Sequence, residues 1–537
     1  MLKKVFNRVL ILSLALITLV MAGCSQTDKP EGGQEQEGKK DELILALGSE
    51  PEDGFDPTTG WGRYGSPLFQ STLLKRDKDL KIVNDLATGY EISPDGLVWT
   101  VNLRNDVKFS DGKPLTAEDV VYTFETAAKS GSVVDLGVMA KAEALEDFKV
   151  KFTLSAPQST FINSLIATGI VPKHAHGADY AIRPIGSGPF KFVQWDKGQQ
   201  LIVEINPEYY GPKPSFRKIT FLFLAEDAAF AAAQAGNVDI TAIPPAFANQ
   251  TVPGMKLVSL ESVDNRGIMF PTVKAGGTTE SGNPIGNDVT SDKAIRQAIN
   301  VALDRDALVK GVLEGYGTPA YTVCDKLPWW NPETVINDNN MEEAKGILAE
   351  AGWKDTNGDG VLDKGGLKAQ FTMVYPASDQ TRQSLAIAVA DMIKPLGISI
   401  QVEGKSWDDI ETMMHSNAVL FGWGSHDPSE MYNLYSGKNA GNGWYNTGFY
   451  SNPIVDGYME QALGAKDEKD ANEFWKQAQW NGTTGFSGKG DAPWAWLVNL
   501  KHVYLVREGL SIGDQKIQPH GHGWPITDNI AEWSWEK

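Results

Sequence analysis

Two histidines near the C-terminus have the spacing and surroundings of a small ligand-binding loop. His520 and His522 are two of only seven histidines in the chain of 537 residues, and a single glycine separates them. Pro519 and Pro525 flank the pair. Because proline fixes φ while glycine allows tight turns, the segment predicts a shaped loop. Neutral imidazole is a good ligand for nickel, copper, iron and zinc, so the loop is a candidate metal site. The alternative interpretation is a simple polar turn.

A second candidate contact region lies between residues 420 and 450, where aromatic side chains alternate with Gly, Asn and Asp. Flat apolar faces with a few polar tips are how proteins enclose a small polar molecule. The side chains that we expect to contact a ligand are Trp423, His426, Asp427 and Tyr445. For His426 the alternative role is a cap beside Asp427.

The sequence lacks the motifs of the common enzyme classes. It contains no Gly-x-Ser-x-Gly nucleophile elbow, no His-Glu-x-x-His pair, no phosphate-binding P-loop and no Gly-x-Gly-x-x-Gly after a strand. The interpretation of the chain as a surface hydrolase acting on sugars or peptides would therefore depend only on scattered carboxylates. The missing motifs therefore argue against an enzyme, and we assign no catalytic residues.

The N-terminal segment has the pattern of an export signal. Residues 1–23 begin with three cations and continue with an apolar run that is shorter than the ~20 residues of a membrane span. The run ends in Ala-Gly-Cys24, which resembles the lipobox of bacterial lipoproteins. We therefore expect lipidation of Cys24 and anchoring to the cell membrane, facing outside the cytoplasm. Residues 24–42 lack apolar periodicity and predict a flexible tether. The alternative is ordinary secretion with an unmodified thiol.

Length and composition limit the remaining possibilities. A chain of this length is too long for one hydrophobic core, so two or three domains are expected. A formal net charge of −19 argues against a nucleic-acid partner and is compatible with a cationic or metal-containing ligand. The sequence has two cysteines, and if Cys24 carries lipid, Cys324 has no partner for an intramolecular disulfide.

The body of the chain reads as alternating strands and helices. The apolar run at residues 43–47 and the alternating run at 97–103 predict strands. A helix is expected after Thr116, whose side chain suits an N-cap, and an Ala-rich helix over residues 226–235. Another helix with one apolar stripe is expected to start at Ser291. Helices alternating with short strands indicate an α/β fold.

Several motifs then occur in a characteristic order. They are the segments 109–120, 184–190 with Trp195, 206–211 and 295–306. In this order they resemble the family 5 extracellular solute-binding proteins, the peptide, nickel and opine receptors of ABC importers. The resemblance runs from about Leu43 to the C-terminus.

This resemblance implies an α/β, two-lobed periplasmic-binding-protein-like fold of class II, large family 5 type, with a hinge and a ligand cleft between the lobes. The expected parts are lobe I with an extra subdomain (43–265), lobe II (266–500) and a C-terminal return to lobe I that carries the histidine loop (501–537). It also implies a transport receptor, expected to be a monomer, that works with ABC permease and ATPase subunits.

The family would place the stretch from Gly60 to Pro67 against the cleft, which makes Trp61, Arg63 and Tyr64 candidate ligand contacts. Some nickel-binding members have a third histidine there, whereas this chain has an arginine and a tyrosine. That departure favours a metal held inside a small organic chelator, because guanidinium can bind a carboxylate through two parallel hydrogen bonds. The alternative for Arg63 is a surface salt bridge.

The leading hypothesis is a lipoprotein receptor that captures nickel, or a related divalent metal, as a complex with histidine or an opine-type chelator. His520 and His522 would supply metal-binding nitrogens, and Trp524 would line the pocket. Hinge closure would enclose the cargo before delivery to the permease. The alternative is a di- or oligopeptide receptor in which Asp427 and Arg63 hold opposite peptide termini.

One further loop, residues 355–363, carries oxygen donors at alternate positions, as a calcium loop does. Its twelfth position is Gly366, where a calcium loop of this kind requires glutamate. We therefore expect a turn held by Asx hydrogen bonds.

Overall fold

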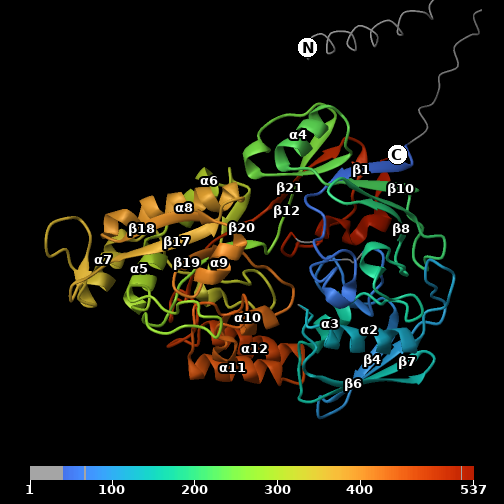
Figure 1. Ribbon diagram of the computed structural model, residues 1–537, viewed down its shortest axis with the longest axis horizontal. Coiled ribbons are helices and arrows are strands. Elements are labelled where there is room, and N and C mark those ends of the chain that lie inside the picture. Colours follow the sequence, from blue (N-terminus) through green and yellow to red (C-terminus); the bar gives the residue numbers. More distant parts are fainter. Residues whose placement is uncertain (1–39, 66–67, 133, 522, 537) are drawn as a thin grey trace, which may run out of the picture. The chain divides into compact units, whose positions relative to one another are not determined.

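The computed structural model describes residues 40–65, 68–132, 134–521 and 523–536. The export signal and Cys24 lie outside these residues, as does the tether up to residue 39. The described chain contains two large mixed sheets, a smaller antiparallel sheet and helices that cover them (Figure 1). None of the helices in the described ranges is long and apolar enough to cross a membrane.

The first large sheet has seven strands in the order β12-β21-β11-β1-β10-β9-β8. Their bounds are β1 Glu42–Ala46, β8 Phe190–Asp196, β9 Gln200–Ile205, β10 Lys218–Leu222, β11 Ile240–Ile243, β12 Met255–Leu260 and β21 His502–Arg507. β1 runs parallel to β10 and β11, while β21 lies antiparallel between β11 and β12. Helix α4 (Glu226–Gln234) connects β10 to β11. The apolar run that predicted the first strand is buried, with Leu43 and Leu45 at most 1% exposed.

The second large sheet has six strands in the order β14-β20-β13-β19-β17-β18. Their bounds are β13 Asn265–Met269, β14 Gly317–Pro319, β17 Gln370–Pro376, β18 Ser399–Lys405, β19 Ala418–Phe421 and β20 Trp494–Leu500. We call the part of the chain built on each large sheet a half of the molecule. The helices of the half built on this second sheet are α5 Lys293–Ala302, α6 Arg305–Gly311, α7 Met341–Glu350, α8 Gln380–Ile393, α9 Trp407–Met413, α10 Ser429–Tyr435, α11 Pro453–Leu463 and α12 Glu468–Gln479. The apolar stripe of α5 packs into the core of this half, as its periodicity predicted.

The start of α5 differs by one residue from the prediction. Asp292, not Ser291, is the N-cap, and its carboxylate accepts a hydrogen bond from the backbone N–H of Ala294 at 3.0 Å. A carboxylate at this position also interacts favourably with the positive end of the helix.

The smaller sheet is antiparallel and has the order β4-β5-β7-β6. Its strands are β4 Ala87–Ile92, β5 Val98–Leu103, β6 Met139–Glu146 and β7 Lys149–Leu154, and the neighbouring helices are α2 Ala117–Lys129 and α3 Phe161–Ala167. Thr116 caps α2 as expected, and its backbone N–H donates to the carboxylate of Asp119 at 2.9 Å. Short pairs complete the strands: β2 Leu74–Arg76 with β3 Ile82–Asn84, β15 Asp363–Lys364 with β16 Leu367–Lys368, and β22 Leu510–Ser511 with β23 Ser534–Trp535.

The chain passes twice between the two large sheets, through residues 261–264 and through Lys501. The two crossings lie beside each other, because the backbone N–H of Leu500 donates to the carbonyl of Asp264 at 2.7 Å. The C-terminal segment joins them, since the N–H of Val263 donates to the carbonyl of Gln518 at 2.9 Å. The histidine loop therefore starts directly on the two crossings.

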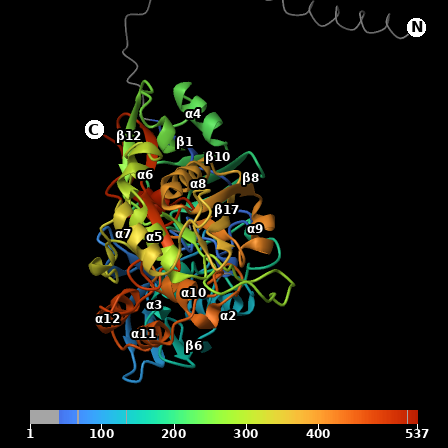
Figure 2. The same ribbon diagram turned by 90° about the vertical axis from the view of Figure 1, so that its left-hand side faces the viewer.

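The two ends of the described part of the chain are visible in the view turned by 90° (Figure 2). Helix α4 and strand β12 lie at one end, and helices α11 and α12 lie at the other, beside the smaller sheet.

Residues 355–363 form the turn expected from the sequence. There, Asp355 accepts the N–H groups of Gly358 at 2.7 Å and Gly360 at 2.9 Å.

Candidate functional site

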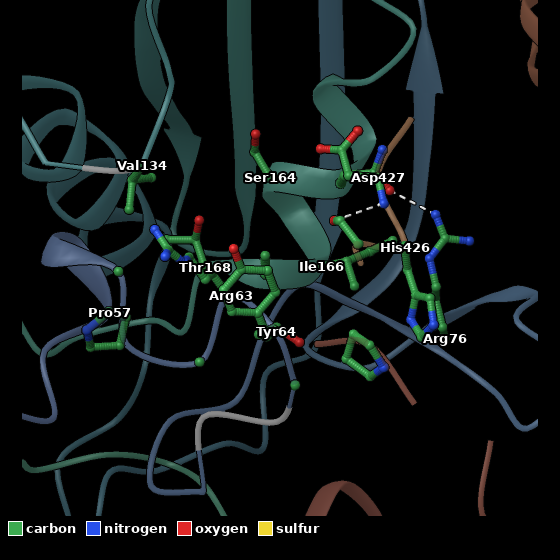
Figure 3. Close-up of a pocket in the computed structure, with 18 of the residues that line it drawn as sticks. Pro57, Arg63, Tyr64, Arg76, Val134, Ser164, Ile166, Thr168, His426 and Asp427 are labelled. Carbon is green, nitrogen blue, oxygen red and sulfur yellow. Dashed lines mark hydrogen bonds between the residues drawn. The ribbon is translucent and has the colours of Figure 1, made fainter. Parts of the chain in front are cut away.

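A cavity of about 240 Å³ lies between elements of the two halves. One side is lined by residues from 57–65, from 70–76 and from helix α3. The other side is lined by the loop that starts at Trp423 and by the first turns of α10 up to Asn433. We call it the central cavity. Of the ligand contacts predicted from the sequence, those that line it are Trp61, Arg63, Tyr64, Trp423, His426, Asp427 and Tyr445. Figure 3 shows part of this lining.

Aromatic rings stiffen the cavity walls. Trp61 is buried and packs edge-on against Phe55, with ring centroids 4.9 Å apart. Across the cavity, the rings of Trp423 and Tyr445 lie 6.2 Å apart. Because these rings are held by other rings, they present apolar faces at fixed positions to whatever enters.

Arg63 brings a positive charge to the cavity. Its guanidinium lies 4.7 Å from the ring centre of Tyr64, a cation–π distance, and the side chain is exposed. Among the described residues, no carboxylate lies within 4 Å of this guanidinium. Burial raises the pKa of Tyr64 to about 12 although Arg63 opposes that shift, so the phenol stays neutral. The surface salt bridge considered for Arg63 is therefore not formed within the described part of the chain.

The loop after β19 is held by a close backbone approach at Gly424. This residue has φ +147°, and a Cβ atom there would come within 2.3 Å of the carbonyl oxygen of Val263. Glu430 accepts the N–H groups of Gly424 at 3.1 Å and Ser425 at 3.2 Å. Burial raises the pKa of Glu430 to about 8 against the opposing effect of these hydrogen bonds, so the carboxyl is protonated at neutral pH.

His426 and Asp427 follow on the same loop and line the same cavity (Figure 3). Burial lowers the pKa of His426 well below its ordinary value, and nearby Lys516 and Arg76 add to the shift. The imidazole is therefore neutral, and its buried Nε2 has no hydrogen-bond partner among the described residues. Asp427 accepts the N–H of Ser429 at 2.9 Å, and burial raises the pKa of its carboxyl.

His520 lies next to the cavity wall and is not one of the lining residues. Its ring centre is 5.8 Å from that of Tyr64, and its backbone N–H donates to the carbonyl of Gly424 at 2.7 Å. Its Nδ1 lies 2.6 Å from Oδ1 of Asp264. Burial lowers the pKa of His520, which outweighs the opposing influence of Asp264, so the ring is neutral. A neutral ring that donates from Nδ1 keeps its lone pair on Nε2.

Asp264 connects several elements. Burial alone would raise its pKa, but Arg266 at 2.5 Å and His520 hold the pKa of this carboxyl well below its ordinary value. Its second oxygen lies 3.2 Å from Nε2 of His502, the first residue of β21. One buried carboxylate thus joins both crossings between the sheets to the histidine loop.

The remaining predicted residues have other positions. Trp524 lies in the core of the first half, stacked on Phe221 with ring centres 4.6 Å apart. It does not line the central cavity, because its large apolar surface is buried against that sheet. His522 and Cys24 lie outside the described residues. Within the described ranges, no group of three or more His, Cys, Asp or Glu side chains is placed to hold a metal ion.

Sequence reasoning missed four contributors to the site: Asp264, Glu430, Arg76 and Asn163. Arg76 donates to the side-chain oxygen of Asn163 at 2.7 Å, and both line the central cavity. Glu430 falls three residues after Asp427 at the start of α10, a spacing that puts both near one helix end. Arg76 and Asn163 gave no local signal for their contact, because they lie 87 residues apart. Arg266, two residues after Asp264, gave no indication that His502 and His520 also contact that carboxylate.

Comparison with known proteins places the chain in a family. Residues 81–446 match the bacterial extracellular solute-binding proteins, family 5, middle region. The chain belongs to this family. Protein XP55 of Streptomyces lividans is 32% identical over 514 residues, which cover 92% of this chain and 91% of that protein.

Two solved structures share the fold over nearly their full length. NikZ from Campylobacter jejuni in complex with Ni(L-His) superposes with a TM-score of 0.79 at 25% identity, covering 92% of this chain and 99% of that one. The oligopeptide-binding protein AppA from Bacillus subtilis, in complex with a nonapeptide, gives a TM-score of 0.72 at 27% identity with the same coverage. The two-lobed α/β fold expected from the motifs is confirmed.

Family 5 solute-binding proteins are extracytoplasmic transport receptors that work with ABC permease and ATPase components. This chain is accordingly the substrate-binding component of an ABC importer. Its relatives include both nickel-complex and peptide receptors, so the family alone leaves the cargo open.

Proposed function

We propose that this receptor captures nickel, or a related divalent metal, as a complex with a small carboxylate-bearing chelator such as histidine. His520 and His522 supply imidazole nitrogens, and Arg63 binds the carboxylate of the chelator. The central cavity encloses the complex. The lipid anchor on Cys24, expected from the sequence, holds the receptor at the outer face of the cell membrane.

The observation that carries the proposal is the contact between His520 and Asp264 beside Tyr64 of the cavity wall. Metal-binding histidines commonly donate their second ring N–H to a carboxylate, which fixes the tautomer and makes the ligating nitrogen more basic. Asp264 supports this arrangement, because it is buried and ionised and lies 2.6 Å from Nδ1. His522, two residues further on, is close enough in sequence to join the same ligand set.

The size and charge of the cavity favour a small anionic group on the cargo. A volume of about 240 Å³ is below the roughly 300–1,000 Å³ of most small-molecule sites. Arg63 offers a guanidinium that no described carboxylate neutralises, and its planar geometry matches a carboxylate. NikZ, solved with Ni(L-His), supports the choice of an amino-acid chelate.

Capture proceeds by closure of the two halves. The cavity has walls from both, and the halves are joined by the crossings at residues 261–264 and 501. A ligand that contacts both walls binds the closed form more tightly than the open form, so it shifts the population toward closure. Release to the permease then requires reopening at these crossings.

Native mass spectrometry with elemental analysis tests the proposal. Purified protein is incubated with Ni²⁺ alone, with Ni²⁺ and L-histidine, or with a tripeptide, and is then desalted. We expect one nickel and its chelator to be retained only in the presence of L-histidine. Retention of the tripeptide and no retention of nickel would overturn the proposal.

A short peptide is the second candidate cargo. The observation in its favour is that side chains of opposite charge, Arg63 and Asp427, line one cavity, as the two ends of a peptide require. AppA, solved with a nonapeptide, is a relative with such a cargo. This candidate predicts that replacing His520 and His522 together by alanine leaves binding intact.

A further inference from the structure

The two halves also touch at a place away from the crossings. The smaller sheet and its neighbouring helices lie in the sequence between β1 and β8, so they belong to the first half. Helices α11 and α12 of the second half lie beside this sheet, at the end of the described chain that is away from α4 and β12 (Figure 1). Contacts between these elements join the halves at that end.

Ser159 makes two hydrogen bonds from the first half to the second. Its backbone N–H donates to the carbonyl of Leu463 at 2.7 Å, and its Oγ donates to the carbonyl of Ala462 at 2.8 Å. Ala462 and Leu463 are the last two residues of α11, so their carbonyl groups have no N–H donor one turn further along the same helix. A residue of the first half thus caps a helix of the second half.

Leu80 adds an apolar contact between the halves. It lies between β2 and β3, and its side chain packs against the buried cluster of the second half that contains Trp329 and Trp475. The backbone of Leu80 has φ +63°, a left-handed conformation that is costly for a residue with a bulky side chain. Such a conformation persists only where surrounding contacts over-determine it, and the apolar contact that offsets the cost comes from the other half.

We call the contacts of Ser159 and Leu80 with the second half the closing latch. Neither residue lines the central cavity, but both are joined to its wall. Gln158 and Thr160, on either side of Ser159, line the cavity. Arg76 lines it as well, and its guanidinium donates to the carbonyl of Leu80 at 2.9 Å. Cargo that touches this wall and the closing latch therefore favour the same closed arrangement.

We propose that the closing latch holds the two halves together over the central cavity and so sets how long cargo stays bound. The latch makes no contact with the cargo, so it stabilises the closed form by the same free energy whatever is enclosed. An interaction of this kind raises affinity mainly by slowing release. The inference rests on the closure step of the proposed function, and uses neither nickel nor the histidine loop.

Two substitutions weaken the closing latch one contact at a time. Ser159→Ala deletes the hydroxyl that reaches Ala462 and should lower the ratio of closed to open receptor by about 5-fold. Leu80→Asn deletes the apolar contact but keeps a side chain that tolerates positive φ, and should lower this ratio by about 10-fold.

The matched controls change the same kinds of group within the first half. Ser155→Ala removes a hydroxyl that donates to the carbonyl of Val138 at 3.1 Å. Val83→Asn removes an exposed apolar side chain from β3, the strand that follows Leu80. Both controls should leave the ratio of closed to open receptor unchanged.

Distances between two spin labels report the closed fraction without any cargo. The labels are attached to Leu145→Cys on β6 and Ile454→Cys on α11, two exposed positions in different halves. The full chain also carries Cys24→Ser, and Cys324 is buried, so the introduced thiols are the ones that react. We expect a short and a long distance in this background, with the short one depleted by the stated factors in Ser159→Ala and Leu80→Asn. The same distribution in the background and in both variants would overturn the inference.

Release rates separate this inference from the nickel proposal. With Ni²⁺ and L-histidine as the probe, release should be about 5-fold faster from Ser159→Ala and about 10-fold faster from Leu80→Asn. Release at the wild-type rate from both variants, with folding verified by circular dichroism, would overturn the closing latch. If the receptor retains no nickel but the spin-label distances shift as expected, the closing latch stands and the nickel proposal is overturned, because the distances are measured without cargo.

Discussion

The Nδ1 atom of His520 lies 2.6 Å from Oδ1 of Asp264, although 256 residues separate the two in the chain. Asp264 ends the first crossing between the two large sheets, and His520 belongs to the C-terminal loop. This contact ties the candidate metal-binding loop to the crossings at which, in the proposed function, the two halves close.

Replacing Asp264 by asparagine should weaken both folding and metal capture. Arg266 would lose its buried counter-charge, and we predict a decrease of about 3–5 kcal/mol in the free energy of unfolding. The orientation of His520 would also be lost, which should lower the nickel–histidine affinity by about 10- to 100-fold. Urea unfolding and calorimetric titration measure the two effects.

The matched control is Glu261→Gln, which removes a carboxylate from an exposed ion pair with Lys501 on the same crossings. Its effect on unfolding should stay below about 1 kcal/mol. An Asp264→Asn protein as stable as the wild type would contradict the role given to this carboxylate.

Arg63 should act through the geometry of its guanidinium. We predict that Arg63→Met lowers the nickel–histidine affinity by about 100-fold, since a charge-assisted bidentate contact is lost. Arg63→Lys keeps the charge without the planar pair of donors and should recover only part of the affinity. Arg104→Gln, which removes a half-buried arginine paired with Asp106 away from the cavity, should have no effect on this affinity. Full affinity in Arg63→Met would show that the chelator is held elsewhere.

Acid should release the metal complex. Burial lowers the pKa of His520, so the folded protein keeps this ring neutral at neutral pH and resists its protonation. The stability contributed by the neutral ring is complete above the unfolded value of about 6.5 and is lost as the pH falls below it. Protons compete with the metal for this nitrogen only below the lowered pKa of the folded protein, so the nickel affinity measured by calorimetry should be constant from about pH 8 to 6.5 and decrease only at more acid pH. Titration of the chelate without protein at each pH corrects for its own dissociation, and a corrected affinity that does not fall at any pH down to the onset of acid unfolding argues against histidine ligation.

Glu430 should make the folded protein less stable at alkaline pH. Burial raises the pKa of this carboxyl to about 8, above its ordinary value, so the folded state holds the proton more tightly than the unfolded state. The resulting stabilisation is present at low pH and is lost as the pH rises through about 8. Between about pH 6 and 8.5, the free energy of unfolding measured in urea should fall by about 2 kcal/mol more for the wild type than for Glu430→Gln. Glu430 is protonated in the folded state only if its replacement changes the pH dependence. The control Glu508→Gln, at an exposed position, should show the same pH dependence of the free energy of unfolding as the wild type. The same pH dependence in all three proteins would rule out a protonated Glu430.

Much of the scaffold could be predicted from local sequence. The apolar stripe of residues 294–303 and the capping side chain of Thr116 specify their helices through interactions within a few residues. The order of the motifs indicated the two-lobed fold, which the comparisons confirm. The start of α5 was predicted to within one residue, since the N-cap is Asp292 and not Ser291. Both side chains suit an N-cap, so tertiary contacts decide between them.

The site could be predicted only in part. Aromatic and charged residues at 61–64 and 423–427 stood out by their composition, and the structure brings them around one cavity. The contacts of Asp264 with His502 and His520 could not have been found, because these two histidines approach it only after both crossings are formed, and Arg266, two residues away, does not indicate them. Trp524 follows the histidine loop directly in sequence, yet its indole is buried in the core of the first half, stacked on Phe221.

The decisive measurement of histidine ligation is calorimetric titration of Ni²⁺ with L-histidine at about pH 7.5. The titrated proteins are the wild type and the double variant His520→Ala, His522→Ala. We expect saturable one-to-one binding by the wild type and a loss of at least about 100-fold in affinity in the double variant, with the fold intact by circular dichroism. Equal affinity of the two proteins for the complex, or no uptake by the wild type, would contradict histidine ligation.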